Sequence, residues 1–213
     1  MRVATPNQVL NTLGVVSSVG TSVNAKQALD DTYGGLIAAL ETDLVEASWV
    51  NIFNTPAFSG NLKYPYKIRL SSGFLVEDED VVIRTCKDGF NVFDGSQGVI
   101  LDSTKYICDK TFGVISIFSG LESNDRSLGV WFDSGYKDDG TGQLQGVKSE
   151  IVSAHASLAC SYIMNNSAMI SKERRARQEI PIKSYNDNAT RLIQYFHRPR
   201  MSVVWPVYEQ VIT

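Results

Sequence analysis

The apolar positions in the first sixty residues follow the period of an α-helix. We expect a short helix within residues 5–22, followed by a connection rich in Ser, Gly and Thr. A longer helix follows, with Asn24 as a candidate N-cap. Gly34 and Gly35 weaken this helix and mark a place where a neighbouring helix could approach closely. The positions that define its apolar face are Leu29, Tyr33, Leu36 or Ile37, Leu40 and Leu44.

The middle of the chain changes to the period of a β-strand. Short runs of β-branched and aromatic residues alternate with turn signals rich in Gly, Asp and Asn. These runs predict an antiparallel meander of about six strands. The predicted strands are residues 66–70, 81–86, 90–93, 98–101, 113–118 and 128–132.

The helical period returns at about residue 143. This third helix is expected to run into the charged stretch 171–177 and to end at Pro181, because a proline disfavours helix in the residue before it. A last helix is predicted from Ser184, with an apolar face made of Ala189, Leu192, Ile193 and Phe196.

The order of these elements predicts an α+β fold. Strands nested between helices indicate one domain over residues 1–213, in which a bundle of about four helices carries an inserted antiparallel β-meander. Its predicted parts are N-terminal helices at 1–58, the β insertion at 59–136, C-terminal helices at 143–198 and an extended docking tail at 199–213.

The C-terminal tail is the most unusual segment of the sequence. It follows a basic turn, residues 197–200, and places large apolar residues at a terminus, where chains usually fray unless something holds them. Because apolar surface is unfavourable in water, we expect the tail to dock on its own domain or on a partner. The candidate docking residues are Arg198, Arg200, Val203, Val204, Trp205, Pro206, Val207 and Tyr208.

The net charge of −3 hides an asymmetry along the chain. Residues 171–200 carry eight Lys or Arg and three Asp or Glu, whereas the remainder carries 12 and 20. The basic stretch predicts contact with something acidic, although a solvated helix surface would also explain it. Because the chain lacks the signature of a fold that recognises specific base sequences, any contact with nucleic acid would be electrostatic. The candidate contact residues are Lys172, Arg174, Arg175 and Arg177.

Composition excludes several classes of protein. No apolar run approaches the roughly 18 residues of a membrane helix, and the first residues lack the apolar core of a signal peptide, so we expect a cytosolic product without a membrane partner. The three cysteines form no CxxC pair and the two histidines lie far apart. The sequence therefore predicts no metal site and buried, reduced cysteines.

The sequence contains no recognisable catalytic motif. Phosphate-binding glycine loops, HExxH and GxSxG are all absent. The acidic run 77–80 lacks the spacing of a calcium loop and is expected to be a solvated turn. His155 lies on the apolar side of a predicted helix, so we expect a packed side chain rather than a general base. No cofactor and no enzymatic activity are expected.

Three stretches of the chain together resemble a known family. They are the helix 25–46 with Trp49 and Phe53 after it, the strand 130–136 that closes on Gly and Tyr, and the final segment 192–207. This layout resembles the head–tail adaptor (head completion or connector) proteins of tailed bacteriophages, and the resemblance spans most of the chain.

The resemblance implies a structural virion protein, made in the host cytoplasm. Such proteins form a ring, usually of twelve subunits, in the phage neck beneath the portal. The implied partners are the portal protein, tail and neck proteins and further copies of the chain, with DNA passing through the ring without sequence-specific binding. The C-terminal segment would reach into a neighbour or the portal. A head-closure or tail-terminator ring protein is the alternative within the same class.

An alternative of a different class is a β module that binds a small ligand or a carbohydrate. Its site would be lined by Phe90, Phe93, Trp131 and Tyr136. Packing within the strands explains the same aromatic residues. A ligand that raised the melting temperature would favour the binding module.

Overall fold

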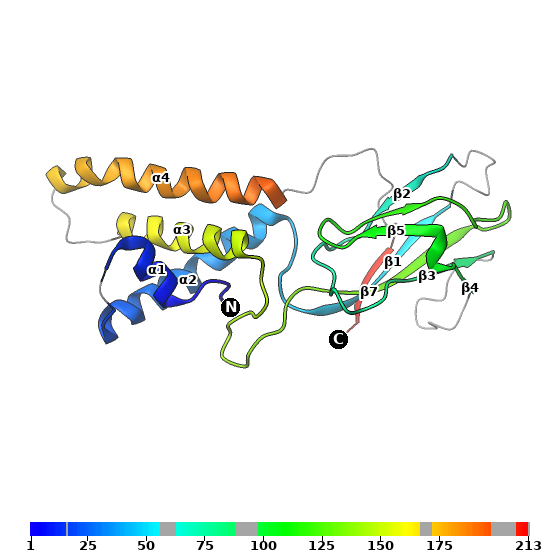
Figure 1. The fold of residues 1–213 in the computed structure, drawn as a ribbon, viewed down its shortest axis with the longest axis horizontal. Helices are drawn as coiled ribbons and strands as arrows, with labels where there is room; N and C mark the ends of the chain where they lie inside the picture. The colour runs from blue at the N-terminus through cyan, green and yellow to red at the C-terminus, as the bar shows by residue number, and fades with distance from the viewer. Residues whose placement is uncertain (16, 56–62, 88–97, 167–171, 197–207, 213) are drawn as a thin grey trace. The chain divides into compact units, whose positions relative to one another are not determined.

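The computed structural model describes residues 1–15, 17–55, 63–87, 98–166, 172–196 and 208–212. The contacts within the chain divide it into two compact units (Figure 1). Unit 1 consists of Met1–Asp43 and Tyr136–Arg198, and unit 2 of Leu44–Gly135 and Pro199–Thr213. Four helices and antiparallel sheets confirm the predicted α+β class. The grouping of the whole chain into a single domain stays a prediction.

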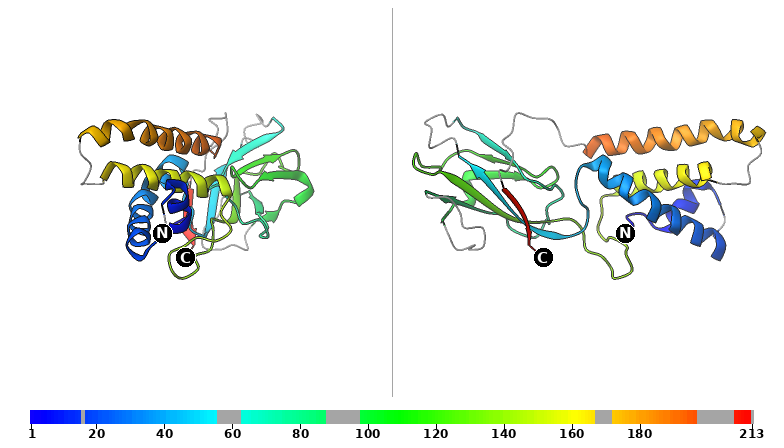
Figure 2. Two further views of the ribbon diagram at one scale, coloured as in Figure 1. Left: turned by 60° about the vertical axis from the view of Figure 1, so that its left-hand side comes forward. Right: turned by 180° about the vertical axis from the view of Figure 1, so that it is seen from behind.

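In its described residues, unit 1 is a bundle of four α-helices. They are α1 (Pro6–Leu13), α2 (Val19–Leu40), α3 (Ser149–Asn166) and α4 (Lys172–Phe196). Helix α3 contacts each of the other three, and Figures 1 and 2 show α4 lying alongside it. One core cluster of this unit is built from small and medium apolar residues, among them Val9, Leu10, Ala28, Leu29, Ala156, Ala159 and Cys160. No helix among the described residues combines the length and the apolar character that crossing a membrane requires.

Helix α2 begins earlier than the sequence pattern predicts. Its N-cap is Ser18, whose hydroxyl accepts from the Thr21 amide at 3.3 Å while the Thr21 hydroxyl accepts from the Ser18 amide at 2.8 Å. This reciprocal capping box satisfies two backbone donors that a helix start would leave unpaired. The Ser/Thr-rich stretch predicted as a connection is therefore the start of a helix, and Asn24 lies inside it.

The prediction that Pro181 ends a helix is wrong. Residues 172–196 form one continuous helix through that proline, and the residues predicted as a separate last helix are its second half. A proline removes one backbone hydrogen bond and crowds the preceding turn. The apolar face beyond it continues in register, with Ala189, Ile193 and Phe196 buried as predicted.

Unit 2 contains two antiparallel sheets. The first has the strand order β4-β3-β7-β1-β8, and the second has the order β2-β6-β5. Strands distant in sequence are thus neighbours, an arrangement more complex than a simple meander. The strands are β1 (Ala47–Asn54), β2 (Tyr66–Arg69), β3 (Val82–Cys86), β4 (Val99–Ile100), β5 (Tyr106–Asp109), β6 (Val114–Ile117), β7 (Ser127–Ser134) and β8 (Tyr208–Ile212).

Several strand predictions are confirmed and others need correction. The runs predicted around β2, β3, β4, β6 and β7 form strands, whereas residues 90–93 lie outside the described residues. Strand β1 lies inside the stretch 1–58 that was predicted to be helical, and β8 lies inside the predicted extended tail. The sequence of β1 is rich in β-branched and aromatic residues, which suit a strand buried within a sheet.

Facing side chains of the two sheets form one apolar core. Phe53, Ile83 and Val130 contribute from the first sheet, and Ile68 and Ile115 from the second, all fully buried. The polar residue Asn51 of β1 is also fully buried. Because this core joins both sheets, it fixes the position of β1, on which the candidate site is built.

Gly34 and Gly35 of α2 have no steric role within the described chain. An added Cβ at Gly34 or Gly35 would meet no other described part of the chain within 4 Å. We therefore expect Gly34→Ala and Gly35→Ala each to raise the free energy of unfolding by about 0.5–1 kcal/mol, because alanine loses less conformational entropy in a helix. Urea denaturation followed by circular dichroism measures the change. A loss of stability would mean that something approaches these glycines in solution.

Candidate functional site at the edge of β1

The described end of the C-terminal tail forms a strand. Of the predicted docking residues, Arg198, Arg200, Val203, Val204, Trp205, Pro206 and Val207 lie outside the described residues. Tyr208 begins β8, which pairs antiparallel with β1 so that Tyr208 lies opposite Ile52 and Val211 opposite Trp49. Docking of the tail on another chain stays a prediction, since this pairing is within one chain.

Strand β1 offers β8 a neutral edge. Its other edge is fully paired with β7 over eight residues, from Ala47 opposite Ser134 to Asn54 opposite Ser127. The five residues of β1 that face β8 are Ser48, Trp49, Val50, Asn51 and Ile52, none of which is charged. Val50 and Asn51 are fully buried. An edge of this kind accepts an extended strand through backbone hydrogen bonds, which is the geometry of β-strand addition.

Hydrogen bonds hold β1 in place on the core side. The side-chain amide nitrogen of Asn51 donates to the Ser71 hydroxyl at 2.9 Å, and the Ser71 backbone amide donates to the Asn51 side-chain oxygen at 2.6 Å. Further along the strand, the Tyr66 hydroxyl donates to the Asn54 carbonyl at 3.2 Å. The buried side-chain amide of Asn51 thus both donates and accepts a hydrogen bond. These two bonds hold β1 in position, so its edge is preorganised for pairing with another strand.

Helix α4 carries the predicted basic contact residues in its first two turns. Lys172, Arg174, Arg175 and Arg177 all fall within this part of the helix. Cations at a helix N-terminus are unfavourable because the backbone amides there carry partial positive charge. Their contact with an acidic partner stays a prediction.

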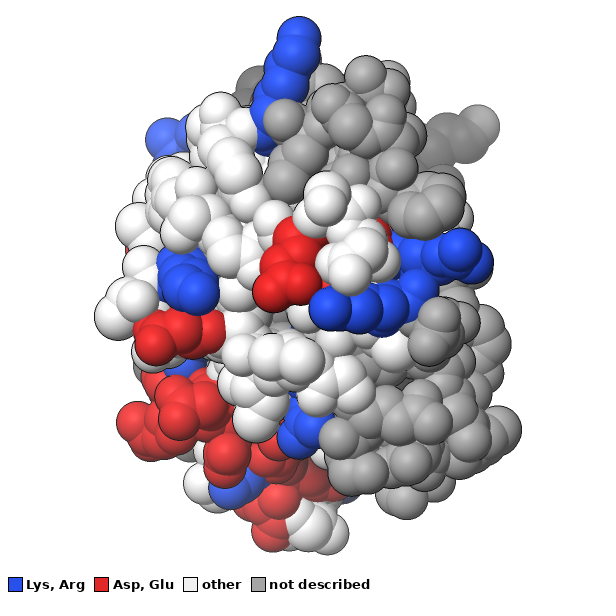
Figure 3. All heavy atoms as spheres, turned by 90° about the vertical axis from the view of Figure 1, so that its right-hand side faces the viewer, with Lys and Arg blue, Asp and Glu red and all other residues white. Residues whose placement is uncertain are grey.

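The acidic run 77–80 is an exposed turn between β2 and β3, as predicted. The Lys110 ammonium group donates to the carbonyl oxygens of Val76 at 3.2 Å, Glu77 at 2.6 Å and Glu79 at 2.9 Å, which holds the turn in one conformation. On the face shown in Figure 3, Asp and Glu side chains gather at one side, whereas Lys and Arg are spread out. Within the described ranges, no group of three or more His, Cys, Asp or Glu could hold a metal ion.

The cysteines are only partly as predicted. None of the three forms a disulfide within the described chain, and only Cys160 is buried, whereas Cys86 and Cys108 are half-buried. Burial raises the pKa of the Cys108 thiol to about 11 and that of Cys160 to about 12, so both thiols stay protonated at neutral pH. A protonated thiol is a poor nucleophile, and neither cysteine is prepared for catalysis.

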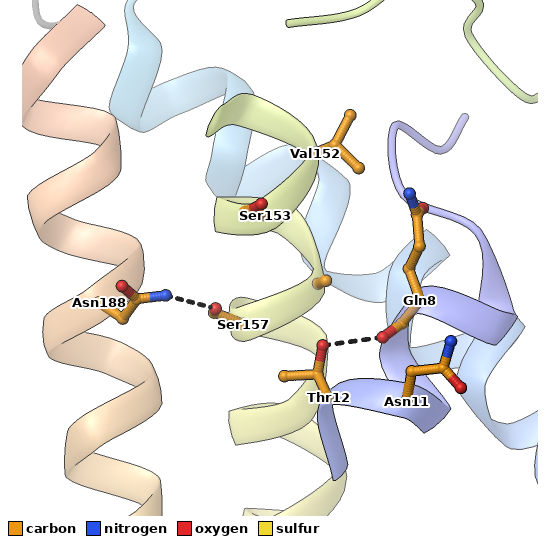
Figure 4. A pocket seen from close by; sticks show the side chains of 8 residues that line it. Gln8, Asn11, Thr12, Val152, Ser153, Ser157 and Asn188 are labelled. Carbon is orange, nitrogen blue, oxygen red and sulfur yellow. Dashed lines mark hydrogen bonds between the residues drawn. The ribbon is translucent and has the colours of Figure 1, made fainter. Parts of the chain in front are cut away.

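A hollow of about 420 Å³ in unit 1 lies among α1, α3 and α4 (Figure 4). Its polar lining includes Asn188, which donates to the Ser157 hydroxyl at 3.0 Å, and Thr12, which donates to the Gln8 carbonyl at 2.8 Å. Among the described residues that line it, none is charged and none is a histidine or cysteine. Within the described lining, the Ser and Thr hydroxyls therefore have no neighbouring base that could activate them as nucleophiles.

The aromatic residues proposed for a ligand-binding module are not brought together by the described structure. Phe90 and Phe93 lie outside the described residues. Trp131 is half-buried on β7 with the Arg84 guanidinium 5.7 Å from its ring centre, while Tyr136 begins the second segment of unit 1. Trp131 thus has a cation–π contact within its own sheet.

Comparison with known proteins finds weak structural similarity to solved structures. No family model and no curated protein matches the sequence. A chain in a solved structure titled "Virion of native gene transfer agent (GTA) particle" is similar to this one at 8% identity, over 92% of this chain and 90% of that chain, with a TM-score of 0.45.

Proposed function

We propose that this chain is a structural virion protein of a tailed bacteriophage, a subunit of the neck ring that joins the portal to the tail and lets DNA pass. The observation that carries the proposal is the pairing of β8 with the neutral edge of β1. It gives the C-terminal tail a docking mode that uses backbone hydrogen bonds and needs no catalytic residue. The sequence resemblance to head–tail adaptors supports the same assignment.

The same pairing suggests how copies could join. Residues 197–207 separate α4 from β8, and 11 residues can span at most about 36–40 Å. A connection of that length would let β8 of one copy reach β1 of the next copy or an edge on the portal. Head-to-tail contacts of this kind close into a ring when the rotation between copies closes.

Charge supports a role around DNA without base recognition. The basic residues at the start of α4 would contact an acidic surface of a partner, and the acidic excess elsewhere would keep a channel wall from holding DNA tightly. Substituting Arg174, Arg175 and Arg177 with glutamine is the matching test. Weaker assembly with the portal supports the partner contact, whereas weaker retention of DNA in an assembled ring would mean that these arginines line the channel.

The direct test is assembly with the portal protein encoded by the same phage. Native mass spectrometry of the mixture is expected to show a ring bound to the portal for the full chain. Deletion of residues 201–213 is expected to leave a folded but less stable protein that no longer joins the portal, because the deletion also removes the pairing of β8 with β1. Gly34→Ala, which retains residues 201–213, serves as the control variant. Equal binding of the deleted and full chains contradicts docking by the tail, and binding to a tail protein in place of the portal favours a head-closure or tail-terminator role.

A further inference from the structure

The N-terminal segment, residues 1–5, is held in a buried site of unit 1. Arg2, Val3 and Ala4 are buried. The Arg2 amide donates to the Gly142 carbonyl at 2.7 Å, the Leu144 amide donates to the Arg2 carbonyl at 2.9 Å, and the Gln143 side chain donates to the Val3 carbonyl at 2.7 Å. The loop before α3 thus pairs with the segment on one side.

His155 of α3 holds the same segment on the other side. Its Nδ1 accepts from the backbone amides of Val3 at 3.1 Å and Ala4 at 3.4 Å, and its Nε2 lies 3.0 Å from the Leu29 carbonyl of α2. A backbone amide only donates and a carbonyl only accepts. The contacts therefore fix the neutral imidazole with its proton on Nε2 and a lone pair on Nδ1.

The hydrogen bonds of His155 leave no acceptor for a second proton on its imidazole. A proton on Nδ1 would face two amide donors, and both amides would lose their acceptor in a site from which water is excluded, since His155 is 0% exposed. An unpaired buried donor costs about 1–3 kcal/mol. Protonation therefore opposes the closed position of the N-terminal segment.

The charged groups around the ring do not offset this effect. From α2, Asp30 favours the imidazolium, but it is shared with the Met1 ammonium at 3.7 Å and the Arg2 guanidinium at 3.6 Å. Tyr33 of α2 places its ring centre 6.1 Å from that of His155. On the loop before α3, Asp138 and Asp139 accept from amides of their own loop. Burial dominates and lowers the pKa of His155 from 6.5 to about 4.

We propose that the N-terminal segment is a pH-sensitive latch, which opens when a proton binds His155 Nδ1 and closes when that proton leaves. The opened segment would uncover the part of the helical core that Ala4 covers, beside Val9 and Ala159.

The direction of the effect follows from the two protonation states. In the open state His155 is hydrated and titrates near 6.5, whereas in the closed state it titrates at about 4. The latch is therefore fully stabilised above pH 6.5, loses stability as the pH falls toward 4, and changes no further below that. Over this window the ratio of open to closed chains rises by about 300-fold, tenfold for each unit of pH.

The test is amide hydrogen exchange of the full chain between pH 4 and 7.5, corrected for the intrinsic rate at each pH. Protection of the Val3 and Ala4 amides is expected to fall with pH in the wild type, while amides of unit 2 report whether the whole protein unfolds. His155→Gln is the matched variant, because its side chain both donates and accepts and does not titrate. In His155→Gln, protection of the Val3 and Ala4 amides is expected to be independent of pH.

Two results would overturn the latch. One is protection of Val3 and Ala4 that stays constant across the pH range in the wild type, and the other is the same pH dependence in His155→Gln as in the wild type. If His155→Gln does not fold, the NMR titration of His155 in the wild type decides. A pKa of about 4 supports the latch, and an ordinary value near 6.5 contradicts it.

Discussion

Replacing Gly135 with alanine is expected to lower the free energy of unfolding of unit 2 by about 3–5 kcal/mol. Gly135 follows β7 with a φ of 99°, which favours glycine. An added Cβ would collide with the carbonyl group of Val45 and lie 2.7 Å from the amide nitrogen of Glu46. These are backbone atoms that lead into β1, so they cannot rotate away as a side chain could. The collision would displace β1, on which the docking site is built.

Urea denaturation monitored by tryptophan fluorescence measures this loss, because Trp49 and Trp131 lie in β1 and β7. Gly34→Ala is the matched control, since it makes the same chemical change at an open position of α2 and is expected to stabilise. A loss below about 1 kcal/mol for Gly135→Ala would contradict the close approach of residues 45–46 to Gly135.

Removing β8 is expected to destabilise unit 2 by about 2–4 kcal/mol, since each backbone hydrogen bond contributes about 1 kcal/mol. Deletion of residues 208–213 would also leave the edge of β1 unpaired from Ser48 to Ile52. An open, uncharged edge is a template for pairing with other chains, so the deleted protein is expected to aggregate more readily. Urea denaturation gives the loss of stability, and light scattering follows the aggregation.

Two proline substitutions in β8 distinguish the loss of its backbone pairing with β1 from any other effect of changing the tail. In an edge strand, adjacent amides point in opposite directions, so only one of Gln210→Pro and Val211→Pro removes a hydrogen bond to β1. One substitution is expected to cost as much as the deletion and the other much less. Two neutral substitutions would show that β8 does not pair with β1 in the isolated chain.

Local patterns predict much of this fold. The buried face of α4 at Ala189, Ile193 and Phe196 and the strands β3, β6 and β7 follow directly from hydrophobic periodicity. The sequence pattern places the start of α2 too late, because the hydroxyl residues Ser18 and Thr21 suit a loop as well as a helix start. Pro181 is a second error, since α4 runs through this proline from Lys172 to Phe196 although the local pattern predicts that the helix ends there.

The candidate site depends on contacts that are distant in sequence. Trp49 pairs with Val211 and with Phe132, and neither partner can be read from the residues around Trp49. The sequence Tyr-Glu-Gln-Val-Ile of β8 lacks a turn signal or a strong alternation, so it predicts only an extended segment. The need of the tail to dock is readable from its apolar residues, but the edge it uses is set by the register of the sheet.

The central claim is that this chain is a structural part of the phage neck. The most direct measurement is quantitative mass spectrometry of purified virions, with the portal protein as the internal standard. We predict that the chain is present at a fixed copy number relative to the portal, with equal numbers if both rings hold twelve subunits. Absence of the chain from virions that contain portal and tail proteins would contradict the claim.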